Sequence, residues 1–266
     1  MALSGLGGDE LFAGYPVFKR TELLYQKSWL WKLPLPLRQL LGKLITALKK
    51  DTASIKLQQL LLSPDASLQY SFPVSRQISN AQQLSLFIEE KFNGIDAVKE
   101  IIKELNKSSA GLPLFSQVSA AEISSYMQNV LLRDTDQMSM AVALEVRVPF
   151  LDYKLVEYVM GVNDEYKNPV YPKKLLVDSL GDLLPDEVVH RKKMGFVFPW
   201  ERWLKKELHA FCGDRIYALA DRGFMNKEAL TDRWQSFNEG KPGVRWLDIW
   251  LCVVLEHWLE KNNIEY

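Results

Sequence analysis

The spacing of apolar residues constrains the fold of this chain more than any other feature. After Tyr15, apolar side chains recur every three or four residues, as on one face of an α-helix, most clearly over 37–48 and 247–258. A clean run of strands with alternating polarity is missing, and only 144–148, which ends at Pro149, has the pattern of extended chain. The sequence therefore predicts a mainly α fold.

Turn and capping signals divide the chain into segments. Ser119 with Glu122 three residues later has the capping-box pattern, and Asp152 and Asn226 are suitable N-caps. The polar stretch 51–79 contains Pro64 and Pro73, which predicts short helices and loops. Pro34, Pro36, Pro172 and Pro199 are suited to helix starts. We expect helices over 37–48, 81–92, 95–105, 120–132, 135–143, 153–160, 173–180, 200–211, 227–237 and 247–258.

Composition limits the functional classes. The 266 residues suffice for one large or two modest domains, and the formal net charge of +0 argues against a broad nucleic-acid-binding face. No apolar run approaches the roughly 20 residues that span a bilayer, and the polar residues at 7–10 argue against a signal peptide. Cys212 and Cys252 are isolated from each other, so we expect a reducing, cytoplasmic location.

A glycine-rich stretch, 4–15, begins the chain with the residues SGLGGDELFAGY. Glycines let the backbone approach a ligand, N–H groups at the start of a helix attract phosphate, and a nearby carboxylate can hold Mg²⁺. The alternative is an ordinary turn in which Asp9 and Glu10 only complement a helix N-terminus. Taken alone, the stretch favours this alternative, because it lacks the lysine ending of a P-loop and the spacing of a dinucleotide-binding turn.

Two further segments favour a functional role for the glycine-rich stretch over an ordinary turn. Residues 131–152 read LLRDTDQMSMAVALEVRVPFLD, and residues 190–196 read HRKKMGF, preceded by KKLL at 173–176 and LP at 184–185. Together with 4–15, and in this order, they resemble the synthetase domain of glutamine-dependent asparagine synthetases. The resemblance covers most of the chain, and the part between about residues 29 and 113 is its least specific region.

The resemblance implies a reaction and its cofactors. Members of the family use ATP and Mg²⁺ to adenylate a carboxylate, releasing pyrophosphate, and ammonia from glutamine then displaces AMP. By resemblance, Asp9 matches a Mg²⁺-binding carboxylate, Lys193 a charge-stabilising lysine, and Lys173 and Glu145 further catalytic positions. By the same resemblance, the glycine-rich turn would line the ATP and acceptor site with Ser4, Gly5, Leu6, Gly7, Gly8 and Glu10.

The chemistry of adenylation agrees with these roles, although each residue also has a structural interpretation. Cationic donors and Mg²⁺ stabilise the charge that develops on the phosphates, and a carboxylate such as Glu145 can accept a proton from the amine. Glu145 and Arg147 share one face of an extended stretch, however, and can form an ion pair. The basic run 191–193 can be a solvated turn, and Asp134, Asp136 and Asp152 can be caps or ion-pair partners. His190, His209 and His257 form no metal or triad pattern.

Some family features are missing. The glutaminase domain of the family uses an N-terminal cysteine as its nucleophile, whereas this sequence has Ala2 at position 2 and no such domain follows. The S-G-G-x-D-S pyrophosphate loop would lie before Ser4. We therefore expect the helical C-terminal portion of an α/β, PP-loop-ATPase-like synthetase domain whose parallel sheet is largely absent. Its expected parts are an ATP and Mg²⁺ loop at 1–15, a variable helical segment at 16–115 and a helical active-site and C-terminal segment at 116–266.

The acceptor and the activity of the isolated chain stay open. Asparagine synthetases commonly carry an acidic residue where this chain has Leu6, so the acceptor is aspartate or a related acid. We expect the isolated chain to be inactive, and a glutaminase domain and a homodimer are the expected partners, with no nucleic acid or membrane. Two alternatives are a non-catalytic helical module derived from the family and a β-lactam-synthetase-like ligase, which usually has tyrosine at the position of Leu6.

Overall fold

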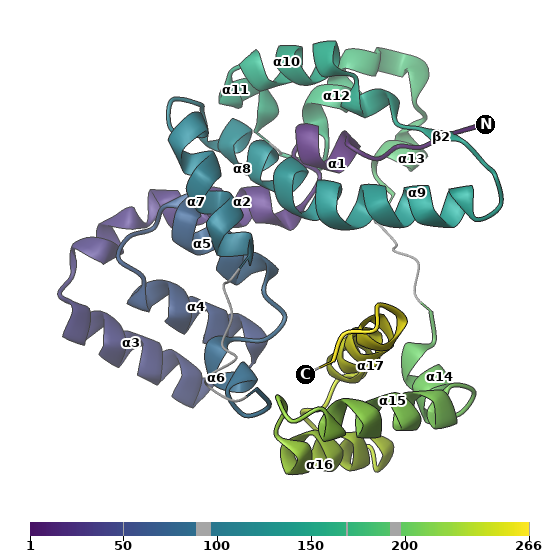
Figure 1. The fold of residues 1–266 in the computed structure, drawn as a ribbon. Helices are drawn as coiled ribbons and strands as arrows, with labels where there is room; N and C mark the ends of the chain where they lie inside the picture. Colours follow the sequence, from purple (N-terminus) through teal and green to yellow (C-terminus); the bar gives the residue numbers. More distant parts are fainter. Residues whose placement is uncertain (50, 89–96, 169, 192–197, 266) are drawn as a thin grey trace. The chain divides into compact units, whose positions relative to one another are not determined.

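The computed structural model describes residues 1–49, 51–88, 97–168, 170–191 and 198–265. These residues are mainly helical and include one two-stranded parallel sheet (Figure 1), which confirms the predicted fold class. The chain divides into two compact units. Unit 1 contains Met1–Gln77 and Asp96–Arg191, and unit 2 contains Ile78–Ile95 and Lys192–Tyr266. Among the described residues, no helix has both the length and the apolar character needed to cross a membrane.

Unit 1 contains both strands and most of the helices. Its elements are β1 (Ala2–Leu3), α1 (Gly8–Leu11), α2 (Pro16–Gln26), α3 (Leu35–Leu48), α4 (Thr52–Leu62), α5 (Leu68–Arg76), α7 (Ala97–Ser109), α8 (Leu114–Glu122), α9 (Leu132–Met140), β2 (Val146–Arg147), α10 (Tyr153–Gly161), α11 (Asp164–Lys167), α12 (Lys174–Leu180) and α13 (Asp186–Val189). Its larger core joins Phe18, Phe72, Phe115 and Val118 from α2, α5 and α8, and the rings of Phe18 and Phe115 meet edge to face.

The central helix of unit 1 is longer than the sequence predicts. It begins at Leu114, directly after Pro113, and passes through a π-helical stretch, Ile123–Leu131, into α9. The predicted N-cap at Ser119 is therefore wrong. Ser119 lies inside α8, where its hydroxyl donates a hydrogen bond of 2.8 Å to the carbonyl of Glu10. The capping-box pattern was misleading because the Ser119 hydroxyl makes a tertiary hydrogen bond to Glu10 and does not cap a helix.

Helix α3 forms at the predicted stripe, but the stripe faces away from the core. Its buried residues are Arg38 and Gly42, and Arg38 donates hydrogen bonds to the carbonyls of Leu33, Leu61 and Ser63. Gly42 lies against Gln58 of α4. A buried guanidinium thus holds the start of α3 against the end of α4, while several leucines of α3 are exposed.

Unit 2 is a helical cluster around an apolar core. It contains α6 (Ala81–Leu84), α14 (Trp200–Lys205), α15 (His209–Asp221), α16 (Lys227–Asn238) and α17 (Trp246–Lys261). The single helix predicted over 200–211 is wrong, because the chain breaks between α14 and α15. The cap at Asn226 is confirmed, since its Oδ1 accepts a hydrogen bond of 3.0 Å from the Ala229 N–H. The helix predicted over 81–92 is observed only over α6, and 89–96 lie outside the described residues.

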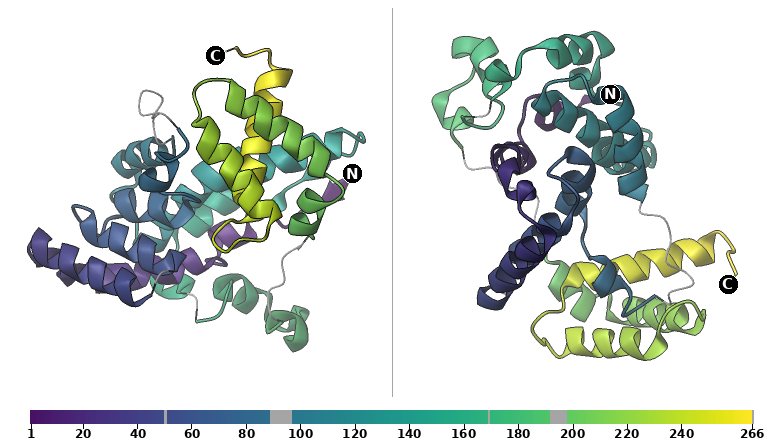
Figure 2. Two further views of the ribbon diagram at one scale, coloured as in Figure 1. Left: turned by 90° about the horizontal axis from the view of Figure 1, so that it is seen from below. Right: turned by 90° about the vertical axis from the view of Figure 1, so that its left-hand side faces the viewer.

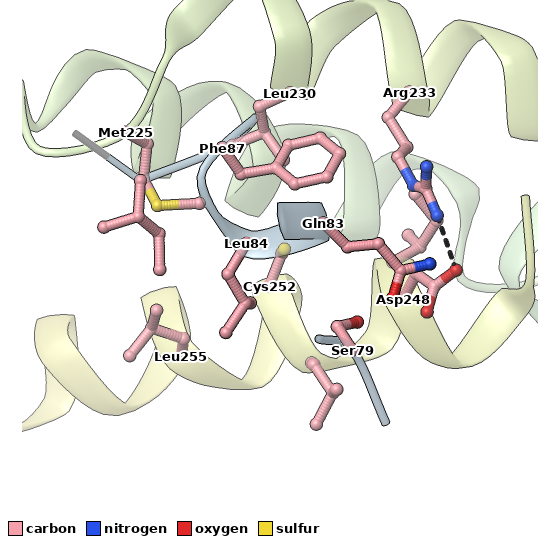
Figure 3. Close-up of a pocket in the computed structure, with 13 residues that line it drawn as sticks. Ser79, Gln83, Leu84, Phe87, Met225, Leu230, Arg233, Asp248, Cys252 and Leu255 are labelled. Atoms are coloured by element: carbon pink, nitrogen blue, oxygen red, sulfur yellow. Dashed lines mark hydrogen bonds and ion pairs between the residues drawn. The ribbon is translucent and has the colours of Figure 1, made fainter. Parts of the chain in front are cut away.

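The segment around α6 closes one side of the unit 2 core. Leu84 and Phe87 line a cavity of about 190 Å³ together with residues of α16 and α17 (Figure 3). On its polar side, Arg233 donates a hydrogen bond of 2.7 Å to Asp248, and its guanidinium lies 5.2 Å from the centre of the Phe87 ring. Residues that follow α5 in sequence therefore complete the core built by the last third of the chain.

Candidate functional site

The short parallel sheet joins the glycine-rich turn to a distant part of the chain. The Ala2 N–H donates a hydrogen bond of 2.8 Å to the Glu145 carbonyl, and the Ser4 N–H donates one of 2.8 Å to the Arg147 carbonyl. These pairs place the turn that follows β1 directly beside β2. The extended chain predicted near Pro149 is confirmed at β2, and its role is to align two of the segments that carry the family resemblance.

The turn itself requires glycine at Gly7, and Gly8 packs closely against its neighbours. Gly7 has a φ of +94°, and a Cβ there would lie 2.7 Å from Leu151 Cδ2. Gly8 is buried, and a Cβ there would touch the Phe150 ring at 3.4 Å. Gly5 is exposed and Leu6 half-buried, and the Leu6 N–H approaches Ser4 Oγ at 3.4 Å. The glycine pattern is therefore explained in part by the tight packing of the turn against the residues that follow β2.

Asp9 and Lys173 form the charged pair next to this turn. Lys173 Nζ lies 3.4 Å from Asp9 Oδ1, and both side chains are partly exposed, at 34% and 21%. Lys173 directly precedes α12 and has a φ of +62°, a backbone conformation that is costly for a lysine. The structure thus brings together two of the predicted site residues, on elements more than 160 residues apart in sequence.

Gly14 is a residue that the sequence analysis did not single out. A Cβ at Gly14 would overlap Asp9 Oδ1 and lie 2.9 Å from Asp9 Cα. The Gly14 N–H also donates a hydrogen bond of 2.8 Å to the Asp9 carbonyl. Its position five residues after Asp9, where the chain folds back after α1, is the signal that could have identified it.

Glu10 lies in the interior. It is 1% exposed, and its carboxylate accepts a hydrogen bond of 2.7 Å from the Tyr15 hydroxyl. Burial and this hydrogen bond raise the pKa of Tyr15 well above its usual value. Nearby, Arg76 makes a two-pronged ion pair with the fully buried Glu122, and its guanidinium lies 4.5 Å from the centre of the Tyr126 ring. Glu10 therefore contributes to a polar network behind the turn.

Glu145 is exposed and has a nearby partner. Arg147 Nε donates a hydrogen bond of 2.8 Å to Glu145 Oε1, and both side chains are about 60% exposed. The geometry is that of the ion pair which the sequence offered as the alternative interpretation. Lys193, the remaining predicted catalytic residue, lies outside the described residues.

The other acidic candidates have structural positions. Asp152 caps α10, where its Oδ1 accepts hydrogen bonds from the Lys154 and Leu155 N–H groups. Asp134 and Asp136 are exposed on α9. Over the described ranges, no cluster of three or more histidine, cysteine, aspartate or glutamate side chains could enclose a metal ion. A metal at Asp9 would therefore need most of its ligands from elsewhere.

The arrangement combines three features that suit a phosphate ligand. A glycine-rich backbone turn allows close approach, Asp9 offers an oxygen ligand of the kind Mg²⁺ prefers, and Lys173 supplies an ammonium. A single carboxylate is sufficient where phosphate oxygens and waters complete the octahedral shell of Mg²⁺. The donor set at Asp9 is thus compatible with a magnesium–phosphate complex.

Comparisons with known proteins place the chain among related sequences. The family model described as asparagine synthase matches residues 1–260. The chain is 27% identical over 270 residues to asparagine synthetase [glutamine-hydrolyzing] 1 of Bacillus subtilis, covering 100% of the chain and 41% of that relative.

Two further relatives are similar over smaller or comparable regions. Asparagine synthetase [glutamine-hydrolyzing] 3 of Bacillus subtilis is 46% identical over 69 residues, which are 26% of this chain and 11% of that protein. Amidase chyE of Penicillium rubens is 27% identical over 237 residues, covering 79% of this chain and 34% of the relative. No solved structure matches the chain significantly. The chain thus spans about two fifths or less of the length of these relatives.

Proposed function

Because this chain belongs to the asparagine synthase family, we propose that it supplies part of the synthetase site of an ATP-dependent amidotransferase. The observation that carries the proposal is the meeting of Asp9 and Lys173 beside the glycine-rich turn. The family match favours a phosphate-binding role for this pair over a purely structural ion pair. The similarity to asparagine synthetases of Bacillus subtilis supports the asparagine-forming class of reaction.

The proposed reaction has two steps, and the ammonia for the second comes from hydrolysis of glutamine by water. A carboxylate oxygen of the acceptor attacks the α-phosphorus of ATP, forming an acyl-adenylate and breaking the bond to pyrophosphate. Ammonia released from glutamine then attacks the acyl carbon, the bond to AMP breaks, and the nitrogen loses a proton. Both steps develop negative charge on phosphate oxygens, which fixed cationic groups stabilise.

Lys173 is proposed to stabilise this charge. Its ammonium is held 3.4 Å from Asp9 and would lie within 3.7 Å of a Cβ placed on Gly8, so it stands beside the turn. Lys193 is proposed as a second cation by family resemblance alone. Glu145 is the proposed proton acceptor for the amine, and in this role its ion pair with Arg147 would have to open.

Asp9 is the proposed magnesium ligand. Magnesium would neutralise phosphate charge and favour departure of pyrophosphate. The Lys173 ammonium already pairs with Asp9, which orients the carboxylate beside the turn. The acceptor is proposed to be aspartate or a related acid, and Leu6, which carries no charge, is the reason for testing acids other than aspartate.

The test uses the protein at its natural length, with the measurement of pyrophosphate release from ATP. We expect release that depends on Mg²⁺ and on one member of a panel of carboxylic acids, and amide formation when glutamine is added. Asp9→Asn and Lys193→Ala should each lower the rate at least tenfold while far-UV circular dichroism is unchanged. Release that is unaffected by both substitutions would refute the site assignment, and no release with any acid would refute the synthetase proposal.

A further inference from the structure

Helix α3 exposes a continuous apolar stripe. Leu37, Leu40, Leu44 and Leu48 are 43%, 53%, 51% and 89% exposed, respectively. Their spacing of three and four residues places them on one face of the helix. Single exposed leucines are ordinary on protein surfaces, whereas a row of four along one helix indicates a surface that something covers.

The orientation of this stripe is fixed by the opposite face of the helix. Arg38 is buried and donates a hydrogen bond of 2.8 Å to each of the carbonyls of Leu61 and Ser63, at the end of α4. Gly42 lies against Gln58, also on α4. Figure 1 shows α3 lying alongside α4, and Figure 2 gives two further views of the same ribbon. Rotating the leucines inward would break the Arg38 contacts, so the packing of α3 on α4 keeps the leucines exposed. We call α3 and α4 together the α3–α4 hairpin.

The charge around the hairpin is net positive. Residues 22–65 contain seven basic and three acidic residues, although the whole chain has a formal net charge of +0. Lys27, Lys32 and Lys43 are exposed, whereas Lys49 pairs with Asp51 and Arg38 is buried. A groove of about 490 Å³ between α2, α4 and α5 repeats this bias, because its charged lining residues are Arg20, Lys27 and Lys56 and none is acidic.

Aromatic side chains add a third feature. Tyr25 and Trp29, in the segment that leads from α2 to α3, are 65% and 57% exposed. Tyrosine and tryptophan favour the boundary between apolar and aqueous phases, where the ring and its polar group are both accommodated. Leucines on one face, basic residues around them and aromatics near one end are the properties of helices that lie on anionic bilayers.

We propose that the α3–α4 hairpin is a docking surface for an anionic lipid bilayer. Two copies of the hairpin would bring like charges together, which disfavours its use as a self-association surface. An anionic bilayer instead satisfies both the apolar stripe and the excess positive charge. Adsorption of this kind needs no membrane-spanning helix, and it leaves the Asp9–Lys173 site to other surfaces of unit 1.

The test is flotation of the purified chain with lipid vesicles. Vesicles of phosphatidylcholine with 30% phosphatidylglycerol should carry the protein, and vesicles of phosphatidylcholine alone should not. Binding should weaken as salt is raised from about 50 to 500 mM, because salt screens the charges. Failure to float with the anionic vesicles at low salt would overturn the proposal.

Matched variants separate the hairpin from general charge. Leu40→Ser with Leu44→Ser should weaken binding at least tenfold, whereas Leu183→Ser with Val188→Ser, at comparably exposed positions of unit 1, should not. Lys32→Glu with Lys43→Glu should also weaken binding at least tenfold, since each basic residue near an anionic surface contributes roughly a fivefold factor. Lys154→Glu with Lys206→Glu changes the net charge equally and should leave binding within twofold.

Two outcomes would contradict the proposal at this stage. Equal losses in the hairpin variants and their controls would show that binding depends on total charge rather than on the hairpin. A protein that is oligomeric by sedimentation and becomes monomeric with Leu40→Ser and Leu44→Ser would show that a second copy covers the stripe. Circular dichroism of each variant verifies that the helices are retained.

Discussion

At the scale of single residues, the position of Asp9 depends on Gly14. A methyl group at Gly14 would overlap the Asp9 carboxylate. Gly14→Ala should therefore displace Asp9 or the chain around it and reduce stability by about 1–3 kcal/mol. Gly161→Ala is the control, because a Cβ there meets no atom within 4 Å and alanine favours the end of α10. Urea unfolding of the two variants measures the difference, and equal stabilities would contradict the packing argument.

Lys173 combines an ammonium next to Asp9 with a left-handed backbone conformation, and a glycine substitution tests the two separately. Lys173→Gly keeps the left-handed conformation at lower steric cost, so stability should change by less than about 1 kcal/mol even though the partly exposed pair with Asp9 is lost. At the natural length of the protein, pyrophosphate release should fall at least tenfold, because the ammonium that pairs with Asp9 beside the turn is removed. Lys174→Ala, which removes the neighbouring lysine that pairs with Asp178, should retain the rate. A fully active Lys173→Gly variant would remove Lys173 from the site.

The site residues Asp9 and Lys173 could be predicted from the sequence, but the contacts that surround them could not. Asp9 and Lys173 were both selected by resemblance, and their contact follows from folding rather than from any local pattern. The internal position of Glu10 depends on Tyr15 and on the helix that passes behind the turn. Such contacts join residues that are far apart in sequence, and no periodicity within one segment contains that information.

At the scale of elements, the ion pair between α5 and α8 predicts a pH dependence. Burial raises the pKa of Glu122 to about 7, although the Arg76 guanidinium opposes this rise. An acid whose pKa is higher in the folded state stabilises the fold at low pH, and this contribution is lost as pH rises from about 4.5 through 7. The loss is at most about 3 kcal/mol for the single group.

Urea unfolding at pH 5 and pH 8 tests this dependence. Glu122→Gln should reduce the difference between the two pH values, since the residue no longer titrates. Arg76→Met should destabilise the protein by about 3–5 kcal/mol at pH 8 and by less at pH 5, because a buried carboxylate without its partner can be protonated at the lower pH. The same pH difference in the parent and in Glu122→Gln would contradict the assignment to Glu122.

The cap of α16 is a second prediction at this scale. Asn226→Ala should cost about 0.5–2 kcal/mol, because the Ala229 N–H loses its hydrogen bond to the side chain. Asn226→Asp keeps an acceptor at the same place and should cost less than about 0.5 kcal/mol. Thermal unfolding measures both values. Equal losses in the two variants would show that the cap contributes through packing and not through its acceptor.

Element prediction succeeded where the local signal agreed with the tertiary structure. Asn226 and Asp152 cap the helices that follow them, and β2 forms at the extended stretch before Pro149. Ser119 had an equally good local pattern, yet it lies inside a helix because its hydroxyl bonds to Glu10. For α3, periodicity predicted the helix but not which face packs, and Arg38 and Gly42 are the residues that face α4.

At the scale of the whole molecule, residues Ile78–Ile95 belong to unit 2 although the chain on both sides of them belongs to unit 1. This assignment could not be predicted from the sequence, because an amphipathic pattern shows that a segment packs but not against which core. In the structure, Phe87 and Ile88 pack on the core that includes Leu230 and Ile249. The Asn226 N–H also donates a hydrogen bond of 2.7 Å to the Phe87 carbonyl.

The packing of Phe87 predicts that the Ile78–Ile95 segment stabilises the C-terminal helices of unit 2. Phe87→Ala should destabilise unit 2 by about 1–3 kcal/mol, because it removes a partly buried ring from the cavity wall and from its contact with Arg233. Tryptophan fluorescence is a suitable readout, since six of the eight tryptophans follow residue 199. Leu86→Ala, at a neighbouring exposed position, should change the urea midpoint little. If both variants unfold at the parent midpoint, the Ile78–Ile95 segment contributes nothing to unit 2, and the cavity in Figure 3 is not closed by Phe87 in solution.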